Sequence, residues 1–545
     1  MTTALLLTLF LPLLGSLIAL MINKDNVKLI KNLTFGLSLV TFAVSVILLM
    51  NFDNNNQNFQ FVIDIPWISS LDAGFRIGLD GMSMMMVVLT TFITPIALLS
   101  SFESIHKKEK EYYIMIGLLQ FGMTGVFASL DLFLFYIFWE LILIPMYFII
   151  GIWGGKNRIY ASVKFFLFTV VGSLFMLVAI VWLGYYGGTQ LLNMPSGFTT
   201  NLMTLRDVSS QIPFEIQKWM FLAFALSFLI KVPVFPFHTW LADAHTEAPT
   251  PGSVILAGVL LKMGTYGLIR FNLDLFPQAS FAYAGIISGL AVVGIIYGAL
   301  VAMVQVDVKK LVAYSSISHL GFVVLGIFSM TAEGVQGAII QMVNHGLSTG
   351  MLFICVGVLY ERRHTRLMAD FGGIAKIMPV YAVFFAIAMF ASVGLPGLNG
   401  FVGEYLTLIG AFKSPFLNSY VFAILGATGV IFAAVYLLTM YQKVMFGTND
   451  NPANHHLKDL NKNELAMMIP LTIFIVWIGI YPATFLNVSE NSTKALINKL
   501  ELIKFGKKHF TLPNDSLQNV NNGTNAPRVI DQNSGTNGFN GNIVP

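Results

Sequence analysis

Long apolar runs separated by short polar segments extend from the N-terminus to about residue 487. A helix needs about 20 mostly apolar residues to cross the hydrocarbon core of a bilayer, so each run of that length predicts a transmembrane helix. The pattern indicates an all-α polytopic membrane protein with 14 spans. These spans are predicted at residues 3–22, 29–50, 78–101, 112–130, 131–151, 162–186, 216–236, 250–271, 280–304, 308–329, 334–360, 377–411, 419–446 and 464–487.

The spans form groups along the chain. Residues 1–111 hold the N-terminal helices, and two blocks of five spans follow at 112–271 and 280–446. The span at 464–487 is predicted to be the last. Residues 488–545 are polar and become rich in Asn, Gly, Thr and Ser, which is typical of a disordered tail.

Each five-span block contains a helix that proline and glycine should interrupt, near Lys231–Pro236 in the first block and Pro396–Glu404 in the second. Proline removes a backbone donor and clashes with the preceding turn, and irregular backbone at membrane depth survives only against protein or water. Paired broken helices in equivalent halves point to the site of a transporter. Because each block has an odd number of spans, the second should run through the membrane inverted relative to the first.

The composition agrees with a membrane protein, since 56% of the residues are hydrophobic and only 11% are charged. Lysine and arginine set its orientation: 18 lie in the odd-numbered loops and five in the even-numbered ones. The odd-numbered loops should therefore be cytoplasmic, with both termini on the outer side. The net charge of +4 reflects these loops, and nothing indicates nucleic-acid binding. The single cysteine, Cys355, excludes a disulfide or a four-thiolate cluster within this chain.

Four charged residues lie inside or at the breaks of apolar spans, namely Glu140, Lys231, Lys262 and Glu404. A charged side chain at membrane depth costs roughly 2.5–3.5 kcal/mol on insertion scales, so such a residue indicates a function. Four of them suggest a route for charge, and protons are the predicted cargo. Glu140 also fits a structural counter-charge, although a buried pair kept only for stability contributes little.

Two histidines, His319 and His345, are equally central in their spans. Ten residues of helix place a side chain about 15 Å deep, near the bilayer midplane. The four charged residues and the two histidines could therefore form a row across the middle of the membrane, parallel to its plane. A lone histidine on an apolar helix also fits a structural group, and both interpretations stay open for these two.

Segment 238–247 begins with His238 and also holds His245 and Glu247, which raises the question of a metal site. The spacing fits no standard zinc pattern, because the two histidines are about two helical turns apart. The segment is better interpreted as an interfacial half-helix after the first break. No metal site is predicted.

Simple electrostatics indicates how the row could move protons. A carboxylate about 4 Å from an ammonium group gains roughly 4 kcal/mol at an effective dielectric constant near 20. This could change a lysine pKa by up to roughly three units. We therefore expect Glu140 to hold a proton on Lys231 when the two are close, and to release it towards Lys262 when they separate.

The run from 231 to 268 reads Lys-Val-Pro-Val-Phe-Pro-Phe-His-Thr-Trp-Leu-Ala-Asp-Ala-His-Thr-Glu-Ala-Pro-Thr-Pro-Gly-Ser-Val-Ile-Leu-Ala-Gly-Val-Leu-Leu-Lys-Met-Gly-Thr-Tyr-Gly-Leu. This run resembles the signature of the antiporter-like subunits of respiratory complex I, the proton-translocating NADH:quinone oxidoreductase. Similar regions surround Glu140, precede His319 from Asp307 onward, and follow Gly394. The resemblance covers about residues 75–450 and is closest to the M type of bacterial subunit, in which an acid such as Glu404 stands at the second break.

The resemblance implies a 14-helix fold with inverted five-helix repeats in a bacterial inner membrane. Glu140 and Lys231 would be the coupling pair, Lys262 the central relay, His319 and His345 the connection, and Glu404 the terminal group. Weaker candidates for the path or for subunit contacts are Asp131, Lys164 and His238.

The resemblance also implies that the redox groups lie elsewhere. NADH, FMN, the iron–sulfur clusters and quinone would belong to partner subunits, with no cofactor in this chain. Antiporter-like neighbours would flank it on both sides within the lipid bilayer.

Three alternatives remain from the sequence. A subunit of a multi-component cation/proton antiporter or of a membrane-bound hydrogenase would share the same channel, and Glu404 favours complex I over these. An inert scaffold predicts that the buried lysines are dispensable. A stand-alone drug exporter with 14 helices would need a substrate cavity, and a row of charges argues against one.

Overall fold

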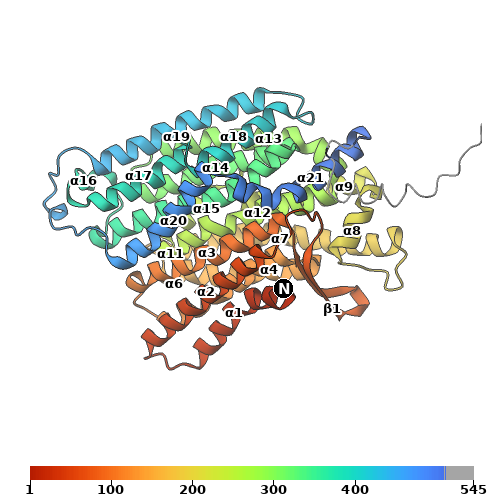
Figure 1. The fold of residues 1–545 in the computed structure, drawn as a ribbon, viewed down its shortest axis with the longest axis horizontal. Coiled ribbons are helices and arrows are strands. Elements are labelled where there is room, and N and C mark those ends of the chain that lie inside the picture. Colours follow the sequence, from red (N-terminus) through yellow and green to blue (C-terminus); the bar gives the residue numbers. More distant parts are fainter. Residues whose placement is uncertain (508–509, 511–545) are drawn as a thin grey trace, which may run out of the picture.

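The computed structural model describes residues 1–507 and residue 510 as a bundle of long helices (Figure 1). Within the described residues, 11 helical stretches are long and apolar enough to cross a membrane. They are α1 (Thr2–Met21), α2 (Val27–Met50), α3 (Gly81–Ser104), α5–α6 (Leu132–Leu141 and Leu143–Trp153), α7 with its π-helical end (Arg158–Leu191), α11–α12 with two π segments (Thr250–Leu273), α13 (Pro277–Met303), α14 (Val308–Ser329), α15 (Ala332–Arg363), α19 (Val421–Met445) and α20 (Lys462–Ile480).

The other three predicted spans are also helical, but they differ from an uninterrupted apolar helix. The span predicted at 112–130 is α4 (Glu109–Ala128). The span at 216–236 is α9 (Phe214–Lys231), which carries three charged residues. The span at 377–411 is divided into α17 (Pro379–Val393) and α18 (Asn399–Lys413), preceded by the single turn of α16 (Ile374–Ile377).

Both helices predicted to be interrupted are broken in the structure. Helix α9 ends at Lys231, turns follow, and the next helix is α10 (Thr239–Glu247). Helix α17 ends at Val393 and is followed by Gly394, whose φ of +84° is in the left-handed region that glycine adopts most easily; α18 begins at Asn399. Each break places a charged group, Lys231 or Glu404, next to non-helical backbone.

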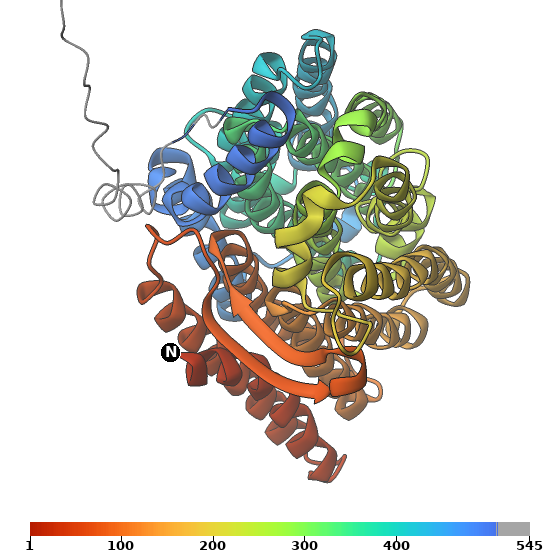
Figure 2. The same cartoon turned by 90° about the vertical axis from the view of Figure 1, so that its right-hand side faces the viewer.

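A β-hairpin corrects the prediction of an all-α fold. Strands β1 (Gln60–Ile68) and β2 (Ala73–Leu79) pair antiparallel, at the end of the bundle that also holds the N-terminus and α8 (Leu202–Val208) (Figures 1 and 2). The segment that forms the hairpin lies between two predicted spans and begins with a polar, asparagine-rich stretch. The alternation of apolar and polar residues that follows is typical of a strand with one buried face.

Asp131 anchors this hairpin to the bundle. Its carboxylate accepts hydrogen bonds from the backbone N–H groups of Phe133 and Leu134, which caps the N-terminus of α5. The same carboxylate forms an ion pair of 3.0 Å with Arg76 of β2 and accepts a hydrogen bond from Thr200. These contacts account for the burial of Asp131.

The C-terminal region differs from the prediction in two ways. Helix α20 ends at Ile480 rather than continuing to 487, because Pro482 follows. Residues 488–505, predicted to be disordered, belong to a separate helix α21 (Ala483–Phe505), which packs against α3 and α15. Many of its residues are polar, yet Leu496, Ile497 and Leu500 are buried against the bundle, and these tertiary contacts outweigh the polar composition. The rest of the predicted tail, residues 508–509 and 511–545, lies outside the described residues.

An ion-pair cluster holds α21 to the bundle. Asp274 lies just after the span that ends at Leu273 and forms ion pairs with Arg206 of α8 (2.9 Å) and Lys499 of α21 (2.8 Å). Burial alone would raise the pKa of the Asp274 carboxyl, but the two cations outweigh burial and lower this pKa from 3.8 to about 2. A lowered pKa in the folded protein stabilises the fold above about pH 4, and this stabilisation is lost as the pH falls towards 2.

Replacing Asp274 with asparagine should therefore loosen α21. The pKa difference corresponds to about 2 kcal/mol at neutral pH, so amide hydrogen exchange in α21 should accelerate by about tenfold or more. Asp207→Asn, which changes an exposed neighbouring carboxylate, is the matched control and should leave the exchange unchanged. Equal exchange in the Asp274 variant and the unaltered protein would show that the ion pairs do not hold α21.

The centre of the bundle is formed by α14, α15 and the α11–α12 region, all of which are almost wholly buried. Two π-helical segments, Leu256–Leu260 and Leu268–Leu273, flank α12 (Leu261–Gly267). π segments are uncommon and occur frequently at functional sites. This centre carries three of the six principal ionisable residues predicted from the sequence, namely Lys262, His319 and His345.

Candidate functional site

Lys262 and His345 are in direct contact at the centre of the bundle. The Lys262 side chain on α12 is fully buried, and its Nζ lies 2.8 Å from Nδ1 of His345 on α15. The same ammonium group donates a hydrogen bond to the carbonyl of Ala257, which belongs to the preceding π segment. A buried lysine is thus held by two polar partners, one of which can itself take up a proton.

His319 of α14 continues the series from His345. The two imidazole rings are 6.1 Å apart between centroids and inclined at 59°. Nδ1 of His345 faces Lys262, while its Nε2 has no hydrogen-bond partner in the described part of the chain. Both rings are buried, at 2% and 3% exposure.

Glu404 ends the series. Its Oε1 lies 2.8 Å from Nδ1 of His319 and accepts a further hydrogen bond of 3.2 Å from Gln341. The other ring nitrogen of His319, Nε2, lies 3.3 Å from the hydroxyl of Tyr436. At Gly394, a Cβ atom would lie only 2.9 Å from Oε2 of Glu404, so glycine at the second break leaves space for this carboxylate.

The first two predicted residues, Glu140 and Lys231, are close without a salt bridge between them. Nζ of Lys231 lies over the rings of Trp139 and Phe165, at 5.2 and 5.6 Å from their centroids, and has no hydrogen-bond partner among the described residues. Contacts of this kind contribute about 2 kcal/mol when the cation is desolvated. Glu140 is half-buried at the end of α5, with an Oε1 atom that likewise has no partner in the described chain.

The six residues therefore form two groups rather than one continuous row. Lys262, His345, His319 and Glu404 follow one another in contact or with adjacent rings. Within the described residues, no hydrogen bond or ion pair joins Lys231 to Glu140 or to Lys262. Each predicted residue is buried or half-buried, and none of the charged tips is fully exposed.

The weaker candidates lie away from this series. Lys164 of α7 forms an ion pair of 2.7 Å with Asp243. The ring of His238 stacks on Phe235 and packs edge-on against Tyr297, with centroid distances of 5.6 and 5.0 Å. Asp131 belongs to the hairpin anchor described above. A role of these three residues in proton transfer stays a prediction.

His245 is a residue whose importance the sequence did not reveal. It is fully buried on α10, its ring stacks on Phe353 at 4.6 Å between centroids, and neither ring nitrogen has a hydrogen-bond partner among the described residues. A buried imidazole with two free nitrogens can accept a proton at one and release it from the other. From the sequence, His245 is interpreted only as part of an interfacial half-helix without a metal site, and among the described residues no group of three or more potential metal ligands is found.

Comparison with known proteins identifies the family. The model of the membrane domain shared by NADH:quinone oxidoreductases and Mrp antiporters matches residues 129–433, more than half of the chain. The chain belongs to this family. Every residue of the Lys262–Glu404 series lies within the matched region.

Members of this family with high similarity come from complex I. The chain is 43% identical to NADH-quinone oxidoreductase subunit M of Rickettsia conorii, over 90% of this chain and 98% of the relative. It is also 43% identical to NADH-ubiquinone oxidoreductase chain 4 of Marchantia polymorpha, over 89% and 95% of the two chains. These relatives confirm the resemblance to M-type subunits.

Solved structures give the same result at the level of the fold. A chain of respiratory complex I from Thermus thermophilus with bound NADH matches with a TM-score of 0.77 and 32% identity, over 90% of this chain and 99% of that one. A chain of the Mrp complex from Dietzia sp. matches with a TM-score of 0.78 but only 19% identity. The second match shows a shared fold alone.

Proposed function

We propose that this chain is a proton-translocating membrane-arm subunit, of the M type, in a bacterial NADH:quinone oxidoreductase. The observation that carries the proposal is the buried series Lys262–His345–His319–Glu404, in which ionisable side chains lie in hydrogen-bond contact or with neighbouring rings. Redox chemistry in partner subunits would supply the energy. The high similarity to subunit M and chain 4 proteins supports the assignment to complex I.

The hydrogen-bond geometry suggests how a proton would move along the series. The Lys262 ammonium would give its proton to Nδ1 of His345, and the resulting imidazolium would release the other proton from Nε2 towards His319. His319 would take it at Nε2, beside Tyr436, and give the proton on Nδ1 to Glu404. Each imidazole thus accepts at one nitrogen and donates from the other.

Glu140 and Lys231 would control this transfer. The Glu140 carboxylate acts on the Lys231 ammonium through space, without a salt bridge in the described arrangement. A closer approach would hold the proton on Lys231, and separation would release it towards Lys262. Redox events in partner subunits would change this distance.

The same proposal includes the topology. The 11 apolar stretches together with α4, α9 and the divided α17–α18 would give 14 crossings. The two blocks at 112–271 and 280–446 would be inverted repeats, each with one of the observed breaks. Both termini would lie on the outer side of the bacterial inner membrane, since the basic loops favour the cytoplasm.

The redox groups would belong to partner subunits. NADH, FMN, the iron–sulfur clusters and quinone would bind to other subunits of the complex. Antiporter-like subunits would flank this chain on both sides in the bilayer.

The nearest rival is a subunit of a cation/proton antiporter or of another membrane-bound respiratory complex. A chain of the archaeal membrane-bound sulfane sulfur reductase shares the fold, with a TM-score of 0.79 at 22% identity. The identity to complex I relatives is about twice as high. This difference favours complex I.

Co-purification tests this assignment. An affinity tag on the chain, with membranes dissolved in mild detergent, should recover cluster-bearing subunits that reduce quinone with NADH. Recovery with small antiporter subunits alone would contradict the proposal.

A further inference from the structure

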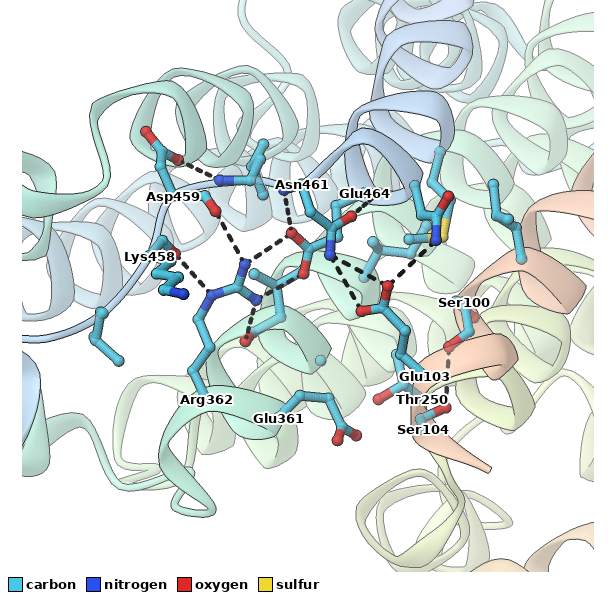
Figure 3. Close-up of a pocket in the computed structure, with 18 of the residues that line it drawn as sticks. Ser100, Glu103, Ser104, Thr250, Glu361, Arg362, Lys458, Asp459, Asn461 and Glu464 are labelled. Carbon is cyan, nitrogen blue, oxygen red and sulfur yellow. Dashed lines mark hydrogen bonds and ion pairs between the residues drawn. The ribbon is translucent and has the colours of Figure 1, made fainter. Parts of the chain in front are cut away.

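A polar pocket of about 680 Å³ opens at the end of the bundle where the basic loops lie (Figure 3). It lies between the C-terminal ends of α3 and α15, the first residue of α11, and the segment that leads into α20. Its wall contains several charged residues. These are Glu103, Glu361, Arg362, Lys458, Asp459 and Glu464.

Most of these charged groups already have partners. Arg362 binds both carboxylate oxygens of Glu464, at 2.6 and 2.8 Å, and Glu103 accepts hydrogen bonds from the side chains of Asn461 and Asn463. Glu361 differs, because it forms no hydrogen bond or ion pair with any described residue and has no dashed line in Figure 3. Its carboxylate is therefore free to exchange protons with water.

Glu361 also lines a second, smaller pocket of about 140 Å³. The two pockets share Ser104, Thr250, Gly357 and Glu361, so they adjoin. Lys309 of α14 lines the second pocket. A polar route thus extends from the basic face to a lysine that is 6% exposed.

Lys309 lies next to the C-terminal end of α10. Its Nζ donates a hydrogen bond to the carbonyl of Ala248, three residues after His245. The His245 ring lies within electrostatic reach of both Lys309 and Lys262. It also stacks on Phe353 of α15, midway between His345 and Glu361 on the same helix. The 16 residues from His345 to Glu361 span about 24 Å, roughly from the bilayer centre to its surface.

We propose that the two pockets form the proton-uptake route of this subunit, with Glu361 as the residue that collects protons from the basic side. Lys309 and His245 then pass each proton to the Lys262–His345 pair. This inference rests on the proposed function and adds a set of residues to it.

The protons balance at each step. Water on the basic side protonates the Glu361 carboxylate, which transfers that proton to the neutral amine of Lys309. The Lys309 ammonium protonates one nitrogen of His245, and the other nitrogen releases its proton towards Lys262. Each group returns to its initial protonation state after one proton has passed.

The test uses the complete complex in inverted membrane vesicles, with protons moved per NADH oxidised as the measured ratio. Glu361→Gln should lower this ratio to the value obtained with Lys262→Met, whereas Glu361→Asp, which keeps a carboxylate, should retain most of it. Glu490→Gln changes a carboxylate that is paired with Lys494 on α21 and should leave the ratio unchanged. A normal ratio in Glu361→Gln, together with a lowered one in Lys262→Met, would overturn the uptake route alone. Normal ratios in both variants would overturn the proposed function as well.

A second measurement does not depend on the carboxylate. Ser104→Cys places a thiol where the two pockets meet, and the single natural cysteine of this chain, Cys355, is fully buried. A bulky anionic thiol reagent that cannot cross membranes should label this thiol in inverted vesicles and lower the proton ratio. Ser210→Cys, at the opposite face beside α8, should stay unlabelled. Complete labelling of Ser104→Cys with an unchanged ratio would contradict the uptake route.

Discussion

Replacing Lys262 with methionine should abolish proton transfer through this subunit while the complex still assembles. Methionine has nearly the same length and shape, so the fully buried position keeps its packing. The variant has no ammonium group to exchange a proton with Nδ1 of His345. A positioned proton donor contributes about 10²- to 10⁴-fold to a rate, and transfer through this subunit should fall by at least about 10²-fold.

The measurement is the number of protons moved per NADH oxidised in inverted membrane vesicles. NADH oxidation with an artificial electron acceptor reports that the redox subunits are intact. Lys413→Met is a suitable control, because this lysine is exposed at the end of α18 and pairs with Glu333 rather than with a residue of the series. An unchanged proton ratio in Lys262→Met would favour the scaffold alternative.

Replacing Glu140 with glutamine should have the second largest effect. Lys231 is buried over two aromatic rings and has no hydrogen-bond partner among the described residues, so Glu140 is the acid that acts on it through space. Without that negative charge, desolvation favours the neutral amine of Lys231. Lys231 would then stay neutral, so the Glu140–Lys231 pair could no longer alternate between holding and releasing a proton. Proton transfer through this subunit should fall by about tenfold or more.

Glu215→Gln is the matched control for this variant. Glu215 lies at the start of α9, the helix that ends at Lys231, and forms an exposed ion pair of 2.9 Å with Lys218. Proton transfer should remain normal in this control. Intact proton transfer in Glu140→Gln would show that Glu140 does not control the proton on Lys231.

The sequence predicted the group from Lys262 to Glu404 better than the pair of Glu140 and Lys231. Lys262, His345, His319 and Glu404 could be placed together because burial of ionisable groups is costly and helix rise fixes their depth. The relation of Glu140 to Lys231 depends on side-chain directions near a helix break, which periodicity does not determine. For the same reason the sequence did not reveal His245, whose surroundings come from elements distant in the chain.

The fold shows a similar limit. Apolar runs located the crossing helices because hydropathy determines which segments enter a bilayer. The sequence does not predict the hairpin and α21, because their stability depends on tertiary contacts, such as the ion pairs of Arg76 with Asp131 and of Asp274 with Lys499. Composition alone carries little information about such contacts.

The direction of α15 has an electrical consequence. Lys262, His319 and His345 lie near the middles of their helices, so a proton that passes among them moves sideways and does almost no work against the membrane voltage. Along α15, by contrast, the path from Glu361 to His345 crosses about half of the bilayer. A full crossing requires about 2.3 kcal/mol per charge at 100 mV, so this vertical segment would carry about half of that work. A change in membrane voltage should therefore alter the arrival of protons at Lys262 and His345, and should have little effect on proton exchange among Lys262, His345 and His319.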